Sequence, residues 1–270
     1  MQCRRGEIAE ALELGNPTGM LRVRAERTGE RTVLTDVYRT APFHLGQVGK
    51  RDDSDGSDLV IQGVGPGYLP GDRVEVDIST GENAHLMVRD QAALKLFPSK
   101  SGQSASATIT LRAEAGSELI YLPGELIPYR QSIYEQRAFV DADPSAHVAY
   151  AEIITPGRTA MGEHFAFERL DLRLDVRLGG VPVLSDRSLI EPAERSMSSL
   201  GRNGHFNVTG ALYLIGSHWQ SIGFGSNESG SRWASDGDDR YVLIRYAAQT
   251  AQEIHTLIRQ HLSLATFGTP

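Results

Sequence analysis

The sequence predicts an all-β protein that folds as a single domain of stacked or wound sheets. Three observations predict this class. Apolar and polar residues alternate in roughly fifteen short runs, which is the period of a half-buried strand. Segments rich in glycine and proline separate these runs, and no shift in composition marks a domain boundary along the 270 residues. One stretch near the C-terminus has the spacing of a helix.

The clearest strand pattern covers residues 170–178, where five aliphatic residues alternate with charged residues of both signs. Residues 73–79 and 105–113 alternate in the same way. A row of charges of alternating sign suits the wet face of a sheet and discourages edge-to-edge association. We therefore expect sheets with one buried face and one solvated face.

A capping box predicts one helix, over about residues 251–265. The Thr250 hydroxyl can accept a hydrogen bond from the Glu253 N–H while the Glu253 side chain reaches back, and apolar residues follow at helical spacing. Residues 1–18 are expected to form a loosely ordered segment, and residues 19–270 the single β domain. Residues 217–239 are rich in glycine, serine and asparagine, and we expect a loop there.

Composition excludes several classes of function. The net charge of -7 and a pI of about 5.6 provide no basic face for nucleic acid. Cys3 is the single cysteine, so the fold does not depend on an internal disulfide. No run of about 18 apolar residues indicates a membrane span, and the N-terminus has no signal-peptide pattern. We expect a cytoplasmic protein.

The segment 157–165, Gly-Arg-Thr-Ala-Met-Gly-Glu-His-Phe, lies between two predicted strands. Its two glycines frame a turn, because glycine readily adopts positive φ. Arg158 and Glu163 either pair with each other or neighbours, or Glu163 faces a polar cavity. The segment alone leaves both interpretations open.

Catalytic motifs are scarce. The glycines at 46 and 49 are too close for a phosphate-binding P-loop, and a strand follows the glycine loop at 63–72 where a dinucleotide site needs a helix. The eight histidines form no HxH or HExxH pair, and no GxSxG elbow is present. The acidic pairs Asp171 with Asp175 and Asp141 with Asp143 are interpreted as solvated surface. A scaffold or binding protein is therefore favoured over an enzyme.

Four stretches, in this order and spacing, resemble the urease accessory protein family called UreD, or UreH in some organisms. They are Gly63–Asp72, Arg89–Phe97, Leu119–Tyr129 and Gly157–Phe167. The resemblance covers about residues 20–260. It implies a non-enzymatic protein wound as an irregular β-helix, with a small helical part near the C-terminus.

The resemblance also implies partners and a cargo. Family members bind an all-helical UreF-like protein and, through it, a UreG-like GTPase, and the assembly docks on apo-urease to assist nickel insertion. Nickel is thought to pass through an internal water-filled tunnel. No tightly bound cofactor is implied, only nickel in transit, because carboxylates attract such a cation without the tight binding of thiolates.

The residues that match the family's motifs are the candidate site. Three acidic residues are predicted along the nickel path: Glu163, Glu125 and Asp72. Five further residues are predicted to shape the motifs: Gly157, Arg158, Gly162, Gly71 and Pro123.

Two alternatives stay open. A wound-β carbohydrate-active enzyme would use surface carboxylates beside a sugar platform made from Trp219 and Trp233. A β scaffold with no metal role is the third hypothesis. Nickel titration in the presence of the partner separates the third hypothesis from the first.

Overall fold

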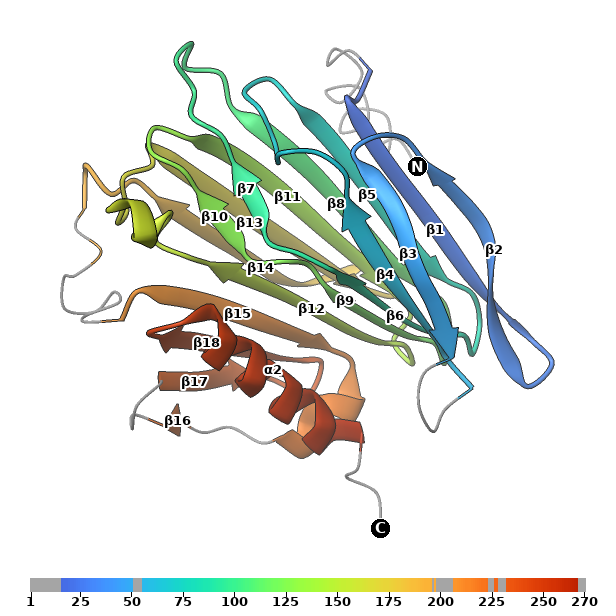
Figure 1. Ribbon diagram of the computed structural model, residues 1–270. Coiled ribbons are helices and arrows are strands. Elements are labelled where there is room, and N and C mark those ends of the chain that lie inside the picture. Colours follow the sequence, from blue (N-terminus) through green and yellow to red (C-terminus); the bar gives the residue numbers. More distant parts are fainter. Residues whose placement is uncertain are drawn as a thin grey trace, which may run out of the picture.

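The computed structural model describes residues 16–50, 55–195, 197, 206–222, 226–227 and 232–266. Strands dominate these residues, and they are arranged in two sheets, here called sheet A and sheet B (Figure 1). A helix near the C-terminus is the main exception. The predicted all-β class with a small C-terminal helical part is confirmed. Most of the predicted N-terminal segment lies outside the described residues, and the first strand begins at Gly19.

In the described part of the chain, sheet A has seven strands and sheet B has eleven. The order across sheet A is β14 (Val181–Ile190), β13 (Arg169–Leu178), β11 (Ile133–Ala142), β8 (Ala105–Ala113), β5 (Arg73–Thr80), β1 (Gly19–Thr28) and β2 (Arg31–Arg39). The main order across sheet B is β16 (Ser226–Asn227), β17 (Arg232–Gly237), β18 (Tyr241–Ala248), β15 (Val208–Ile215), β12 (His147–Ile154), β9 (Glu118–Leu122), β6 (His85–Asp90), β4 (Ser57–Gly63) and β3 (Phe43–Lys50). The short strand β10 (Leu126–Pro128) pairs with β12 and with β7 (Leu94–Leu96).

The chain winds from sheet A to sheet B and back. One coil runs through β5, β6 and β7, the next through β8, β9 and β10, and the third through β11 and β12. Successive coils stack with parallel strands in both sheets. This is a solenoid, and it agrees with the wound architecture that the family resemblance implies.

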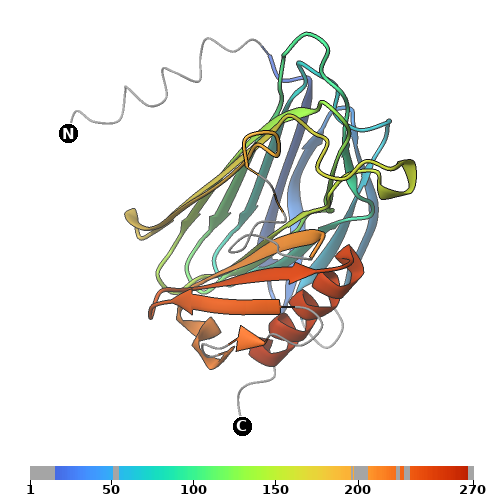
Figure 2. The ribbon, with the colours of Figure 1, turned by 90° about the vertical axis from the view of Figure 1, so that its left-hand side faces the viewer.

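The main core fills the space between the two sheets. Ile78, Leu111, Val140 and Val176 are partners in adjacent parallel strands of sheet A, and all four are buried. Side chains two residues apart share a face of a strand, so an unshifted register builds a continuous apolar column across the coils. Figure 2 shows the two sheets as layers on either side of this core.

A second core lies on the other face of sheet B. Helix α2 (Ala251–Thr266) packs there against β15 and β18, with Ile254 and Ile258 buried beside Leu212 and Ile244 (Figure 1). The predicted capping box is present, because the Glu253 N–H donates to the Thr250 hydroxyl at 3.3 Å. Among the described residues, no helix has the length and apolar character needed to cross a membrane.

The expectation of a loop over residues 217–239 is wrong for most of the residues that the structure describes there, which are 217–222, 226–227 and 232–239. A 3₁₀ helix covers Ser217–Ile222, and β17 pairs with β18 along its length. Trp219 is fully buried in the second core, and its indole N–H donates to the Ile215 carbonyl at 3.0 Å. Tertiary packing thus gives regular structure to the described parts of a segment whose local composition is typical of loops. Strands β3 and β14 lie at or next to sheet edges, and the sequence pattern did not predict them.

The stacked column predicts the cost of losing one of its side chains. Leu111→Ala should lower the free energy of unfolding by about 2 to 5 kcal/mol, because surrounding coils cannot collapse into the space that a deleted leucine leaves. Thr108→Ala, on the exposed face of the same strand, is the control and should change it by less than about 0.5 kcal/mol. Urea unfolding followed by circular dichroism measures both. Equal effects of the two variants would contradict the proposed column.

Candidate functional site

A small cavity lies inside the solenoid, between the two sheets. Its volume is about 40 Å³. One water needs about 10 to 15 Å³ by this measure, so the cavity has room for a few waters or a partly hydrated ion. Sheet A contributes apolar wall residues such as Val76 and Ile109, and sheet B contributes two carboxyl groups, those of Asp90 and Glu152.

Glu152 lies on the inward face of β12 and is hydrogen-bonded on three sides. Its Oε1 accepts from the Gln136 amide at 2.8 Å and from the Tyr150 hydroxyl at 3.1 Å, and its Oε2 lies 3.4 Å from the Tyr213 hydroxyl. Burial raises the pKa of Glu152 to about 7, because the ionised form loses its hydration and these hydrogen bonds offset only part of that loss. The side chain therefore exchanges a proton near neutral pH.

A polar chain leads from Glu152 to the protein surface. The Tyr213 hydroxyl donates to Asp186 on β14 at 2.6 Å, and Arg245 on β18 pairs with the same Asp186 oxygen at 2.5 Å. The Arg245 side chain is 44% exposed, whereas that of Asp186 is 16% exposed. The Asp186–Arg245 ion pair thus lies between solvent and the buried chain that runs from Tyr213 to Glu152.

Asp90, at the end of β6, forms another part of the cavity wall. Its Oδ2 accepts from the Gly124 N–H at 3.1 Å. Its Oδ1 is buried and has no hydrogen-bond partner in the part of the chain that the structure describes. The pKa of Asp90 is raised to about 7, because burial disfavours the ionised form and the hydrogen bond from the Gly124 N–H offsets only part of this effect. An unpartnered buried oxygen of this kind is costly, and it is available to a proton or a cation.

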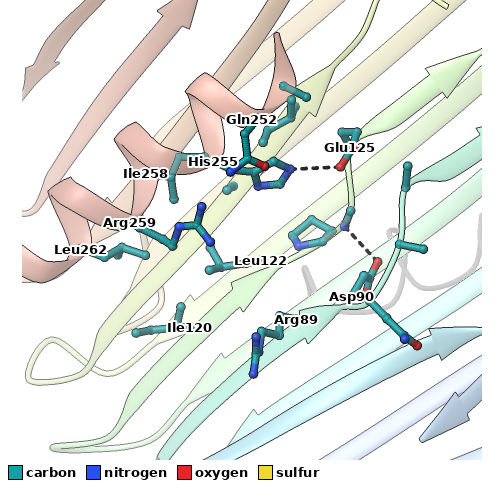
Figure 3. A pocket seen from close by; sticks show the side chains of 18 of the residues that line it. Arg89, Asp90, Ile120, Leu122, Glu125, Gln252, His255, Ile258, Arg259 and Leu262 are labelled. Atoms are coloured by element: carbon teal, nitrogen blue, oxygen red, sulfur yellow. Dashed lines mark hydrogen bonds and ion pairs between the residues drawn. The ribbon is translucent and has the colours of Figure 1, made fainter. Parts of the chain in front are cut away.

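A groove of about 720 Å³ lies on the outside of sheet B, beneath α2 (Figure 3). Its floor is apolar and includes Ile120 and Leu122. At its rim, His255 of α2 is 3.0 Å from Glu125, and this interaction lowers the pKa of Glu125. Figure 3 shows the pair joining the helix to the loop after β9.

Four residues line both the cavity and the groove: Asp90, Pro123, Gly124 and Ile153. They form the wall between the two spaces. Gly124 is required in this wall, because a Cβ atom there would lie 2.1 Å from the Ala92 carbonyl oxygen. The Pro-Gly-Glu turn at 123–125 therefore places Asp90 at the boundary and Glu125 at the groove.

The predicted path residue Glu163 is held by cations. Arg158 donates two hydrogen bonds to it, at 2.5 and 2.9 Å, and the Arg130 N–H donates a third at 3.2 Å. Its pKa is lowered, chiefly by Arg158, whose guanidinium also lies over the Tyr129 ring. The expected Arg158–Glu163 pair is thus present, and Glu163 lines neither the cavity nor the groove.

The two glycines of this segment adopt the positive φ that their turn requires. Gly162 ends the short 3₁₀ helix Thr159–Met161 with φ 71°. Gly157 has φ 117°, and a Cβ atom there would lie 2.8 Å from the Pro128 carbonyl oxygen. Both glycines therefore shape the turn that presents Glu163 to Arg158.

Asp72 closes the turn after the glycine loop. Its Oδ2 accepts from the Leu69 N–H at 2.7 Å, and the preceding Gly71 has φ 88°. Asp72 lines neither the cavity nor the groove. Of the three predicted acidic residues, the structure thus brings only Glu125 to the groove, and it does not bring the three together.

Sequence reasoning missed Asp90 and Glu152. Glu152 shares its strand parity with Val148 and Tyr150, so an acidic residue at an inward position of a strand was the available signal. Asp90 lies in one of the stretches that resemble the UreD family, but its partner Gly124 is 34 residues away. Only the stacking of coils brings those two together.

The burial of Trp219 counts against the alternative of a carbohydrate-active enzyme with a sugar-binding platform. Trp219 is fully buried and cannot stack on a ligand at the surface. The expectation that Asp171 is solvated is also wrong, because it is 5% exposed and Arg173 and Arg187 each pair with it at 2.9 Å. These cations hold the pKa of Asp171 far below its usual range, so it cannot act as a general acid. Among the described residues, no three His, Cys, Asp or Glu side chains form a ready metal cluster.

Fold and site together define a class: a wound-β protein that holds two carboxyl groups in the wall of a small internal cavity. Comparison with known proteins narrows this class. The family model described as UreD urease accessory protein matches residues 17–268. The chain belongs to this family.

Individual relatives agree along most of their length. A urease accessory protein UreD from Arthrobacter sp. (strain FB24) is 27% identical over 263 residues, which cover 92% of this chain and 89% of the relative. A UreD from Haloarcula marismortui is 31% identical over 212 residues, covering 77% of this chain and 71% of the relative. A protein named urease accessory protein UreD 2, from Brucella canis, is 30% identical over 230 residues, covering 77% and 75%.

The raised pKa of Glu152 predicts a pH-dependent gain from its neutral isostere. The pKa of the Glu152 carboxyl rises from 4.5 to about 7 on folding, so the unfolded chain releases this proton at a lower pH than the folded protein does. The free energy of unfolding therefore falls as pH rises between those two values. Glu152→Gln should therefore gain about 2 to 3 kcal/mol relative to wild type between pH 5 and pH 8. Urea unfolding at both pH values measures this difference.

The matched control is Glu75→Gln, on the exposed face of β5. Its stability relative to wild type should shift by less than about 0.5 kcal/mol over the same interval. A pH-independent effect of Glu152→Gln would show that Glu152 is ionised throughout.

Proposed function

We propose that this protein is a non-catalytic accessory protein of urease maturation and that it passes nickel through its interior cavity. Membership of the UreD family supports the role in urease maturation. The observation that carries the nickel proposal is the interior cavity with the carboxyl groups of Asp90 and Glu152 in its wall.

The chemistry of the cavity suits a cation in transit. Both carboxyl groups have a pKa of about 7, so both exchange protons readily at neutral pH. A divalent cation that replaces their two protons leaves the buried site electrically neutral, which limits the desolvation penalty. Carboxylate and phenol oxygens hold nickel less firmly than thiolates do, and the ion can therefore leave.

The cavity is bounded on two sides by polar groups that connect it to solvent. Asp90 separates it from the groove beneath α2, and Glu152 leads through Tyr213 to the Asp186–Arg245 pair. Passage requires movement of the wall at Gly124 and opening of that ion pair. We assign these two places as the ends of the path.

The partners proposed for this chain are those of the family resemblance: a UreF-like helical protein, a UreG-like GTPase reached through it, and apo-urease. The cytoplasm is the proposed compartment, and nickel is the cargo rather than a resident cofactor. Glu125, at the groove, is proposed as an outer residue of the path.

Glu163 and Asp72 stay predictions. Their contacts, with Arg158 and with the Leu69 N–H, favour roles in holding turns. Both are therefore included as separate arms in the experiment below.

Neutral isosteres test the path. Glu152→Gln and Asp90→Asn should each lower urease activation at least tenfold in cells that carry the urease genes and this accessory gene as their only UreD source. The reason is that an amide cannot release a proton to accept a cation. Urease activity and nickel per urease active site are measured together. Full activation by both variants would overturn the cavity as the nickel path.

Three further variants complete the experiment. Glu75→Gln is the control and should leave activation unchanged. Loss of activation with an intact fold in Glu163→Gln or Asp72→Asn would add that residue to the path. Purified protein is also mixed with its UreF-like partner, and two separate species on gel filtration would contradict the proposed assembly.

A further inference from the structure

We infer that His147 and His218 form a binding site for a divalent transition-metal cation of the nickel or zinc class, on the outer face of sheet B. The site is separate from the cavity of the proposed function and does not depend on it. Three observations on the described residues carry the inference: the spacing of the two imidazoles, a buried ring nitrogen of His147 without a hydrogen-bond partner, and the row of outward residues to which His147 belongs.

The first residues of three neighbouring strands form a row at one end of sheet B. His85 on β6, Glu118 on β9 and His147 on β12 are partners in the parallel register. Glu118 and His147 have the strand parity of Ile120 and Ala149, which face the second core, so the row lies on the outer face of the sheet. The stacking of coils thus brings two imidazoles and a carboxylate together, on backbones about 4.8 Å apart from strand to strand.

The 3₁₀ helix Ser217–Ile222 adds a further imidazole, that of His218, beside His147. The two ring centroids are 4.9 Å apart, and the ring planes are inclined at 38°. Two imidazoles that share one ion have ring centres about 4.6 to 5.3 Å apart, because each ligating nitrogen lies about 2.1 Å from the metal. The observed spacing therefore fits a shared ion. Since His218 is exposed, its ring can turn a nitrogen toward that ion without loss of core packing.

A ring nitrogen of His147 lacks a partner. Its Nδ1 is buried and accepts or donates no hydrogen bond within the described residues. A Cβ atom at position 216 would lie 3.0 Å from this nitrogen, so Gly216 leaves the space beside it open. Burial and then the neighbouring His218 lower the pKa of His147, and its imidazole is therefore neutral at pH 7, as a metal ligand must be. A cation bound at this nitrogen would supply the partner that it lacks.

The donor atoms specify the class of cation. Neutral imidazole suits zinc, nickel and copper, whereas calcium and magnesium prefer oxygen ligands. No group of three potential protein ligands is assembled in the described part of the chain, so water completes the coordination of the ion. Glu118, the register neighbour of His147, adds negative charge beside the two imidazoles. The site is therefore an open one that binds its ion reversibly.

This site lies apart from the proposed nickel path. His147 and Glu152 are both on β12, separated by about 16 Å of extended strand. Neither His147 nor His218 lines the cavity or the groove. An ion shared by the two imidazoles would join β12 to the 3₁₀ helix that carries Trp219. Binding would thereby fasten the second core to the end of the solenoid.

Nickel titration of the metal-free full chain tests the inference, with nickel chloride as the probe. The Trp219 ring centroid is 5.3 Å from that of His218, so a paramagnetic ion at this site should quench tryptophan emission. His147→Phe keeps a ring and removes its nitrogens, and His218→Ala changes an exposed position. Each should weaken the nickel affinity measured by quenching at least tenfold. The matched control is His44→Ala, which removes an exposed imidazole from β3 and should stay within twofold of wild type.

Circular dichroism checks the fold of each variant. Hydrogen exchange of the wild-type protein is a second measurement that needs no variant, and residues 147–150 and 216–222 should gain protection when nickel binds. No quenching in the wild-type protein, or wild-type affinity in both histidine variants, would overturn the inference. An equal loss in His44→Ala would also overturn it, because binding would then be spread over surface histidines.

The inference and the proposed function can fail separately. Glu152→Gln should leave the quenching unchanged, and loss of quenching in that variant would overturn the separate site. If the histidine variants lose quenching while Glu152→Gln activates urease fully, the outer site stands and the nickel path through the cavity falls. If Glu152→Gln abolishes activation while both histidine variants bind nickel as wild type does, the cavity stands and the outer site falls.

Discussion

Parallel, in-register stacking of coils is the constraint on which the rest of this protein depends. Each coil places a strand in sheet A and a strand in sheet B, and the register between successive coils does not shift over β5, β8, β11 and β13. Inward residues therefore stay inward from coil to coil. The column of Ile78, Leu111, Val140 and Val176 follows from this register, and so does the position of the cavity. A shift of one residue would turn Glu152 out of the interior.

The same stacking explains how two carboxyl groups persist in an apolar core. Glu152 is surrounded by polar groups of neighbouring strands, namely Gln136, Tyr150 and Tyr213, which partly replace water. Among the described residues, the Gly124 N–H is the one group that donates a hydrogen bond to the Asp90 side chain. Burial outweighs these hydrogen bonds at both positions, and each group takes up a proton near neutral pH instead of remaining charged. Both sites are costly to stability, which is typical of residues kept for function.

The fold could be predicted from sequence where the pattern is local. Alternation predicted strands such as β5 and β13, and the box at Thr250 predicted α2. Prediction of the site was weaker, because its geometry depends on coil length and on contacts between distant residues. Glu163 matched a motif, yet a bidentate Arg158 occupies its oxygens. Glu152 matched no family motif, and only its inward position on β12 distinguishes it from an exposed acidic residue. The buried Trp219 shows the same limit, since its surroundings come from elements elsewhere in the chain.

The reversal of strand direction at the ends of the stack has a consequence for assembly. In sheet A, β2 and β14 are antiparallel to the strands they flank, and in sheet B β3 is antiparallel to β4. An open solenoid presents a terminal coil on which the first coil of another molecule can continue in the same polarity. Here β2, β14 and β3 run against that polarity, so at these three edges a coil of another molecule finds no parallel template. Sheet A therefore ends on both sides in a strand that cannot template a further parallel coil.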